Sequence, residues 1–295
     1  MHNLEKTQYN WQIKKSKIII VMKIFDCFTF YNEFDLLELR LKEHWDYVDY
    51  FVIAEANLTH QGAPKEFFLE KNWDRFRDYH EKIIHVKVND MPVSSDPWVL
   101  EHFQRSALSR GLDLATDEDI IAVSDCDELL KKSTWQTIRE DTEGSTWACK
   151  SFMFQFRLNY LLVSEEATYR YIIHNMIRRG GKNIDPQLIR ATRDELPEDA
   201  RIIDHAGWHF SYLGDTAFAK QKLTSYAHKE FSHLARYANV ERSVDLKIGI
   251  DPASWERFEY IKLDNYFPET VLNDLIRWKK HIVPYAQVNI IDIEI

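Results

Sequence analysis

The sequence predicts a single α/β domain built on a mainly parallel sheet that is flanked by helices. Apolar β-type runs alternate with segments of helical spacing between residues 23 and 125, and this rhythm is typical of parallel sheets with helices on their faces. Hydrophobic residues make up 45% of the 295 residues, which is ample for a packed core. No repeat, low-complexity segment or linker divides the chain. We therefore expect one domain over residues 22–295, preceded by a polar N-terminal extension over residues 1–21.

Hydrophobic periodicity predicts the elements of the N-terminal half. A helix is expected to begin at Asn32–Asp35, where polar side chains can cap it, because leucines follow at helical spacing. A second helix is expected from Trp98 to Gly111, with the glycine near its end. Strands are expected over residues 23–30, 50–54 and 83–88, and from residue 120 onward.

The C-terminal half is organised differently. Residues 147–162 are rich in aromatic side chains and are expected to form strands that pack beneath or beside the site. Residues 173–204 are polar and rich in arginine, which predicts loops flanking short strands. Residues 218–237 carry apolar side chains in rough helical register and are expected to be helical.

Three carboxylates follow the strand that begins at residue 120, at Asp125, Asp127 and Glu128. In extended backbone Asp125 and Asp127 would lie on one face, where like charges repel unless they share a cation. Open α/β sheets bind their ligands at the carboxyl ends of such strands. Oxygen ligands in this position, with room for substrate oxygens, favour Mg²⁺ or Mn²⁺ bridging a diphosphate. The alternative is a solvated turn after a strand, where Asp-x-Asp is common.

A second dense group of unusual residues runs from His205 to Tyr212 and includes Gly207 and His209. The glycine permits close approach of another backbone segment. A third metal ligand is expected from this segment, which would complete an open site with phosphate oxygens and water. The alternative is a histidine that is hydrogen-bonded within an aromatic core.

Charge and cysteine content exclude several classes of protein. The formal net charge is −9 and no long basic run occurs, so neither nucleic acid nor an anionic membrane is the expected partner. Three cysteines without paired spacing argue against a disulfide scaffold or a zinc cluster and favour a reducing compartment. The early apolar run over residues 18–22 is far shorter than the ~20 residues of a membrane span. We expect a soluble, cytoplasmic protein whose oligomeric state the sequence leaves open.

Three separated segments carry a family resemblance. They are Asn32-Glu33-Phe34-Asp35-Leu36-Leu37-Glu38-Leu39-Arg40 with Phe51-Val52-Ile53-Ala54-Glu55-Ala56-Asn57-Leu58-Thr59-His60-Gln61-Gly62-Ala63-Pro64-Lys65; Ser124-Asp125-Cys126-Asp127-Glu128-Leu129; and Ala206-Gly207-Trp208-His209-Phe210-Ser211 with Lys222-Leu223-Thr224-Ser225. Together and in this order the chain resembles glycosyltransferase family 17, the family of β-1,4-mannosyl-glycoprotein β-1,4-N-acetylglucosaminyltransferase. The resemblance spans about residues 22–235. Eukaryotic members are membrane-anchored and this chain shows no anchor, so its acceptor is expected to differ.

The resemblance implies a GT-A-like fold and a metal-dependent, inverting transfer of a sugar. The implied donor is a UDP-sugar, specifically UDP-N-acetylglucosamine, and the implied acceptor is a glycan hydroxyl. Asp125 and Asp127 would hold Mn²⁺ or Mg²⁺ and the ribose or diphosphate, and His209 would contact the metal or the diphosphate.

The resemblance also suggests residues that contact the donor nucleotide. Glu55 would lie near the base and ribose of the donor, with capping of the Thr59–Gly62 turn as the alternative. Arg105 and Lys222 would neutralise diphosphate oxygens, with ordinary surface ion pairs as the alternative.

An inverting transfer also needs a general base for the acceptor hydroxyl. The family pattern favours Glu230, with Asp215 and Glu128 as rivals. Two further hypotheses remain open. The first is a metal-dependent phosphoester hydrolase, although the sequence shows no second acidic cluster of similar density to hold a second metal. The second is a non-catalytic carbohydrate-binding protein that binds sugars through its aromatic residues.

Overall fold

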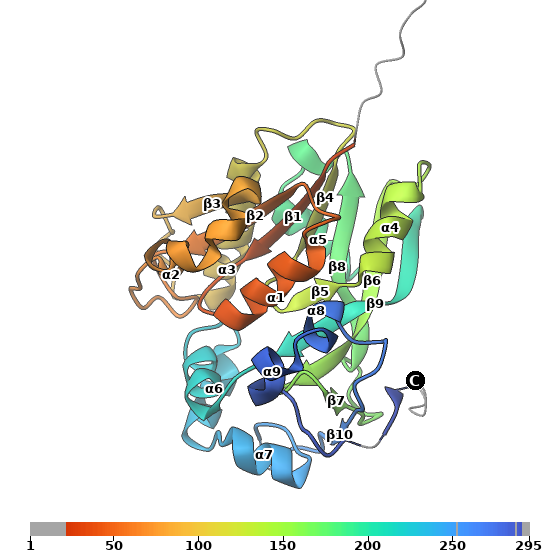
Figure 1. Cartoon of the computed structure of the whole chain (residues 1–295). Helices are drawn as coiled ribbons and strands as arrows, with labels where there is room; N and C mark the ends of the chain where they lie inside the picture. Colours follow the sequence, from red (N-terminus) through yellow and green to blue (C-terminus); the bar gives the residue numbers. More distant parts are fainter. Residues whose placement is uncertain (1–21, 252, 287, 291–295) are drawn as a thin grey trace, which may run out of the picture.

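A mixed sheet with helices on both faces forms the centre of the molecule (Figure 1). The computed structural model describes residues 22–251, 253–286 and 288–290, and the predicted extension over residues 1–21 lies outside them. Within the described residues the sheet has ten strands, eight of them in the order β10-β7-β6-β8-β4-β1-β2-β3, while β5 and β9 pair off this path. The predicted α/β class, a sheet flanked by helices in a single domain, is confirmed, but the sheet is mixed rather than mainly parallel.

The N-terminal half contains the parallel part of the sheet. Neighbouring strands β4, β1, β2 and β3 all run parallel, as expected. The connections between them include helices, as parallel strands require. The strands and the first helix are β1 (Ile24–Thr29), α1 (Phe34–His44), β2 (Tyr50–Ala56), β3 (Ile83–Val88) and β4 (Ile120–Asp125).

Alternate side chains of these strands enter two separate apolar cores, which explains their continuous hydrophobic runs. Phe28 and Ile53 face the core that contains the leucines of α1. Cys27 and Val52 face the opposite core, which contains Leu108. The helical segments between β2 and β4 are α2 (Phe68–Lys71), η1 (Trp73–Lys82), α3 (Pro97–Ser106) and η2 (Ala107–Gly111).

The C-terminal half supplies the antiparallel part of the sheet. β8 pairs antiparallel with both β4 and β6, whereas β9 runs parallel to β6 and antiparallel to β5. The sheet as a whole is therefore mixed, and its parallel order is concentrated in the first half. The elements are β5 (Glu128–Leu130), α4 (Lys132–Glu140), β6 (Thr146–Gln155), β7 (Tyr160–Leu162), β8 (Tyr171–Arg179), η3 (Gly181–Asn183), α5 (Pro186–Ala191) and β9 (Ala200–Ser211).

Two expectations for this half are wrong in detail. Residues 173–204 are not mainly loops, because most of β8, all of η3 and α5, and the start of β9 lie within them. The first half of β9 is largely exposed, so its polar composition hid the strand. The helical stretch over 218–237 is broken: α6 (Thr216–Leu223) ends early, and a 3₁₀ segment, η4 (Lys229–Arg236), follows.

The remaining elements close the lower part of the molecule as it is drawn in Figure 1. Strand β10 extends the sheet edge by pairing antiparallel with β7. The C-terminal helices return to α1, and α8 contacts it directly. These elements are α7 (Val240–Leu246), β10 (Phe258–Tyr260), α8 (Glu269–Leu272), α9 (Leu275–Trp278) and η5 (Lys279–His281).

Candidate functional site

The three carboxylates lie in a tight turn between β4 and β5. Asp125 is the last residue of β4, residues 126 and 127 form the turn, and Glu128 begins β5. Strand β5 pairs with β9 so that Glu128 lies opposite His209. This pairing brings the third segment of the family pattern to the acidic turn, although about 80 residues of chain separate the two.

Gly207 makes that pairing possible. A Cβ atom on this residue would lie 1.9 Å from the carbonyl oxygen of Leu129, in the backbone of β5. Only glycine allows so close an approach, because the obstacle is backbone that cannot rotate away. The close approach predicted from the sequence is confirmed.

Asp127 and His209 are direct neighbours. The Nε2 atom of His209 lies 3.6 Å from Oδ1 of Asp127, and Lys222 Nζ lies 2.6 Å from Oδ2. Burial by itself would raise the pKa of Asp127, but the lysine and the histidine outweigh it and hold that pKa well below its usual range. Asp127 is therefore an ionised carboxylate that is matched by positive charge.

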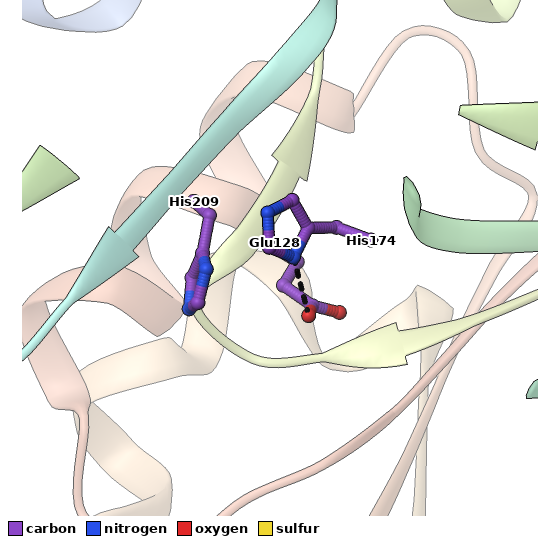
Figure 2. A group of neighbouring side chains, drawn as sticks. All are labelled: Glu128, His174 and His209. Carbon is purple, nitrogen blue, oxygen red and sulfur yellow. Dashed lines mark hydrogen bonds and ion pairs between the residues drawn. The ribbon is translucent and has the colours of Figure 1, made fainter. Parts of the chain in front are cut away.

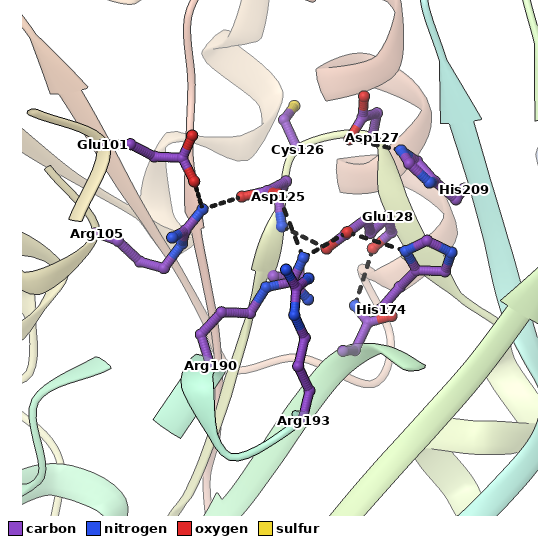
Figure 3. Close-up of polar contacts among 12 residues, drawn as sticks. Glu101, Arg105, Asp125, Cys126, Asp127, Glu128, His174, Arg190, Arg193 and His209 are labelled. Atoms are coloured by element: carbon purple, nitrogen blue, oxygen red, sulfur yellow. Dashed lines mark hydrogen bonds and ion pairs between the residues drawn. The ribbon is translucent and has the colours of Figure 1, made fainter. Parts of the chain in front are cut away.

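Asp125 has a separate set of partners. Arg105 donates to its Oδ1 at 2.9 Å and Arg190 donates to its Oδ2 at 3.3 Å. Figure 3 shows Asp125 turned toward the arginines and Asp127 turned toward His209. The expectation that the two aspartates share one face is wrong, because residues 126 and 127 form a turn rather than extended backbone.

Arg105 is a buried element of the site rather than a surface ion pair. Its side chain is 4% exposed, and it donates to Glu101 and Gln187 as well as to Asp125. Arg190, on α5, is equally buried and also donates to Glu128 Oε1 at 2.6 Å. Two arginines thus lie against the acidic turn, and nucleotide phosphates are typical partners of such groups.

Glu128, His174 and His209 form a second group of side chains beside Asp127 that could hold a cation (Figure 2). Each offers a ligand atom, and these atoms lie within 4.8 Å of one another. The Nδ1 atom of His174 is 3.2 Å from Glu128 Oε1, and burial lowers the pKa of His174 to about 4, so its imidazole is neutral at pH 7. Within the described residues, His174 Nε2 and His209 Nδ1 are buried without a hydrogen-bond partner. Unpartnered buried nitrogens beside carboxylates fit a divalent cation.

A fully buried ion pair between Arg40 on α1 and Asp26 on β1 supports the backbone of the acidic turn. Arg40 pairs with Asp26 at 2.5 and 2.8 Å, and both side chains are at most 1% exposed. The same guanidinium donates to the carbonyl oxygens of Asp125 and Glu128 at 2.8 and 3.1 Å and to the hydroxyl of Ser124 at 2.7 Å. One side chain from α1 thus holds both ends of the turn.

Glu55 is fully buried and accepts hydrogen bonds from the first backbone N–H groups of α2. Its Oε2 accepts from the backbone N–H of Leu69 at 3.1 Å, and its Oε1 accepts from the N–H of Phe68 and from Lys65. It therefore caps the start of α2 rather than the Thr59–Gly62 turn, which closes through its own backbone hydrogen bond.

The three candidate bases lie in different settings. Glu128 is 2% exposed and is paired with Arg190 and His174. Asp215 accepts a hydrogen bond from the N–H of Phe218 and so caps α6. The side chain of Glu230 is 56% exposed, and its Oε1 lies 2.7 Å from His228 Nδ1. Glu128 alone among the three belongs to the acidic turn.

Sequence reasoning missed His174, Arg190 and Arg40 as site residues. The first two lie in residues 173–204, which were expected to be loops, and Arg40 lies on a leucine-rich helix where an arginine usually faces water. The periodicity of α1 contains one signal, because Arg40 falls between the buried Leu39 and Leu41.

Comparison with known proteins identifies the family of the chain. The family model described as glycosyltransferase family 17 matches residues 2–248. The β-1,4-mannosyl-glycoprotein 4-β-N-acetylglucosaminyltransferases of Rattus norvegicus and Homo sapiens are each 28% identical over 134 residues. That match covers 41% of this chain and 25% of each relative, so the chain matches about a quarter of their length.

Among solved structures, a mannosyltransferase from Pyrobaculum calidifontis in complex with GDP-Man and Mn²⁺ matches 72% of this chain and 63% of that chain. Its TM-score is 0.40 and its sequence identity is 12%. No helix within the described residues of the present chain is long and apolar enough to cross a membrane.

Proposed function

The chain belongs to glycosyltransferase family 17, and from this premise we propose that it is a metal-dependent, inverting enzyme that transfers N-acetylglucosamine from UDP-N-acetylglucosamine to a glycan hydroxyl. The observation that carries the proposal is the buried acidic turn, with His209, Lys222 and two arginines around it, at the carboxyl end of a parallel strand. The names of the relatives support N-acetylglucosamine as the sugar and a glycan as the acceptor.

Asp127 and His209 are the proposed ligands of a divalent cation. The carboxylate is ionised, and the pair offers one oxygen and one nitrogen donor. An imidazole ligand favours Mn²⁺ over Mg²⁺, which prefers oxygen alone. Asp125 would contact the cation or the donor ribose. When bound, the cation would stabilise the charge that develops on the leaving diphosphate.

The positive side chains of the site are the proposed diphosphate contacts. Lys222 is held against Asp127, and Arg105 is held against Asp125, so both cations are already oriented toward the acidic turn. Both oxygens of Glu55 accept hydrogen bonds from the protein, so its proposed role is to hold α2 at the nucleotide side of the site.

Glu230 is the proposed general base. Asp215 is engaged as a helix cap and Glu128 is neutralised by Arg190, whereas the carboxylate of Glu230 is exposed to an incoming hydroxyl. The hydrogen bond from His228 lowers the pKa of Glu230, so it is ionised at neutral pH, as a base must be. The replacement Glu230→Gln should abolish transfer and leave donor binding intact, while Glu165→Gln, at an exposed position, should change neither. Normal turnover in the Glu230 variant would remove it from this role.

Calorimetric titration tests the donor site. UDP, UDP-N-acetylglucosamine and UDP-glucose are titrated with Mn²⁺ and with chelator, into the wild type and into Asp127→Asn. Asp113→Asn, which removes an exposed carboxylate, is the matched control. We expect metal-dependent binding that is lost only in the Asp127 variant. Equal affinity with chelator, or in Asp127→Asn, would contradict the metal assignment.

The hydrolase hypothesis has less support. A two-metal hydrolase needs a second group of ligands about 4 Å from the first, and the part of the chain described by the structure contains one such group of histidines and acids. The cytoplasmic location expected from the sequence stays a prediction.

A further inference from the structure

Exposed aromatic side chains gather at the start of α3 and at the start of η4. Trp98 is 37% exposed and Phe231 is 44% exposed. His228 joins them: its ring centroid lies 4.7 Å from that of Trp98 and 5.7 Å from that of Phe231. We call Trp98, His228 and Phe231 the aromatic platform. Large apolar side chains at the surface that contact one another, rather than the core, are typical of binding sites.

The aromatic platform is connected to the acidic turn by a row of contacts. Lys222 pairs with Asp127 and lies over the ring of Tyr212, 5.2 Å from its centroid. Tyr212 packs edge-on against Tyr226, and Tyr226 contacts His228 at 5.5 Å. A second connection runs along α3, because Glu101 lies three residues after Trp98 and pairs with Arg105, which pairs with Asp125. The platform is therefore linked to the proposed donor site through Lys222, Tyr212 and Tyr226.

The platform is held in place before any ligand arrives. Asp96 accepts from the N–H of Trp98 and so caps α3. The Nε2 atom of Gln61 donates to the carbonyl oxygens of Leu223 and Tyr226 at 3.2 and 3.1 Å and lies 2.9 Å from the hydroxyl of Ser232. These bonds fix the segment that carries His228 and Phe231. Preorganised rings bind a ligand without first losing conformational entropy.

The chemistry of the platform suits a neutral saccharide. A sugar ring presents an apolar C–H face, which stacks on aromatic rings, and hydroxyl groups at its edge, which need hydrogen-bond partners. Glu230 lies between His228 and Phe231 in the sequence, and its carboxylate oxygens could accept hydrogen bonds from sugar hydroxyls. The ring nitrogens of His228 could also bond to these hydroxyls. The exposed carboxylate disfavours an anionic nucleotide at this place. The rings of Trp98 and His228 meet at 85°, unlike the two parallel walls that would enclose a flat base.

We infer that Trp98, His228 and Phe231 bind the saccharide acceptor and present its hydroxyl to the acidic turn. This inference rests on the proposed function and adds the location of its second substrate.

The test separates saccharide binding from donor binding. Trp98→Ala and Phe231→Ala are compared with the wild type and with Trp255→Ala, which removes a tryptophan that is 48% exposed elsewhere on the surface. Each protein is applied, with UDP and Mn²⁺ present, to an array of neutral oligosaccharides. The affinity for the strongest array oligosaccharide and for UDP is then measured by calorimetry. Thermal melting checks that each variant is folded.

We expect both platform variants to bind the oligosaccharide at least about tenfold more weakly, with UDP affinity and the Trp255 control unchanged. Three results would overturn the inference: wild-type saccharide affinity in both platform variants, a parallel loss of UDP affinity that would indicate a nucleobase on the platform, or UDP binding by a wild type that binds no oligosaccharide. If the wild type binds neither UDP nor another nucleotide, the proposed function itself fails, and this outcome is distinct from the other three.

Discussion

The acidic turn and the aromatic platform are linked through Lys222, Tyr212 and Tyr226, but they are held by opposite kinds of interaction. The turn is fixed by Arg40, Arg105 and Arg190, whose guanidinium groups are almost completely buried. The platform consists of exposed rings on segments that are fixed by amide-to-carbonyl hydrogen bonds. Buried charge pairs are costly to break, and they suit a site that must hold a cation and a diphosphate. Exposed rings suit a neutral ligand that arrives from water.

The largest expected effect comes from breaking the buried network under the turn. Arg40→Met removes the guanidinium partner of the buried Asp26 carboxylate and leaves it beside His44 Nδ1 at 2.9 Å; breaking such a buried pair typically costs about 3–5 kcal/mol of unfolding free energy. The matched control is Arg110→Met, because Arg110 also makes two bonds to one aspartate, Asp90, but at the surface. The control should cost less than about 1 kcal/mol. Chemical denaturation measures the unfolding free energy of both variants. Equal losses would contradict the claim that the buried ion pair contributes more stability than the surface ion pair.

A second prediction concerns the backbone contact that brings His209 to the turn. Gly207→Ala inserts a methyl group into the backbone of β5, so we expect a loss of about 1–3 kcal/mol in stability. Because β9 must move, the affinity for UDP with Mn²⁺ should fall as well. Denaturation and calorimetry give the two values. If the variant is destabilised but its nucleotide affinity is unchanged, donor binding does not depend on the position of His209.

Lys222 contacts both Asp127 of the acidic turn and Tyr212, which leads to the aromatic platform. Its replacement tests whether the lysine contacts the phosphates of the donor. Lys222→Met should weaken UDP binding about tenfold, as expected for the loss of one charged hydrogen bond, and should leave uridine binding unchanged. Calorimetry with both ligands measures the difference. If uridine and UDP lose affinity equally, the lysine does not contact phosphate.

The smallest effect is expected at a third, partly exposed set of ion pairs between α1 and the C-terminal helices. Burial alone would raise the pKa of Glu38, but Arg277 and its neighbours lower it to about 2. The ionised form is favoured in the folded state, so this stabilisation is complete above about pH 4.5 and is lost as the pH falls toward 2. Glu38→Gln should therefore reduce the fall in stability between pH 5 and pH 3, by less than about 1 kcal/mol. Denaturation at both pH values measures it, and an unchanged slope would contradict the role of Glu38.

The parts of the site that the sequence predicts are those that local chemistry makes visible. An apolar run that ends in Asp125, Asp127 and Glu128 indicates a strand end, and Gly207 beside His209 indicates a close backbone contact. Both features appear in the structure.

The parts that the sequence hides depend on tertiary pairing. His174 reaches the site through the antiparallel contacts of β8, and Arg190 through the packing of α5 on α3. Neither contact could be predicted from sequence periodicity, because both residues lie in a polar stretch of the chain without a regular hydrophobic pattern. Arg40 also has a surface-type side chain, and its burial follows from Asp26 on the neighbouring strand.

One measurement compares the acidic turn and the aromatic platform directly: UDP release from UDP-N-acetylglucosamine with Mn²⁺, in the presence and absence of the array-selected oligosaccharide, for the wild type, Asp127→Asn and Trp98→Ala. We expect the Asp127 variant to lose release under both conditions. The Trp98 variant should keep the slow release that occurs with water as acceptor and lose only the acceleration by the oligosaccharide. If both variants lose the same step, the assignment of donor to the acidic turn and acceptor to the aromatic platform is contradicted.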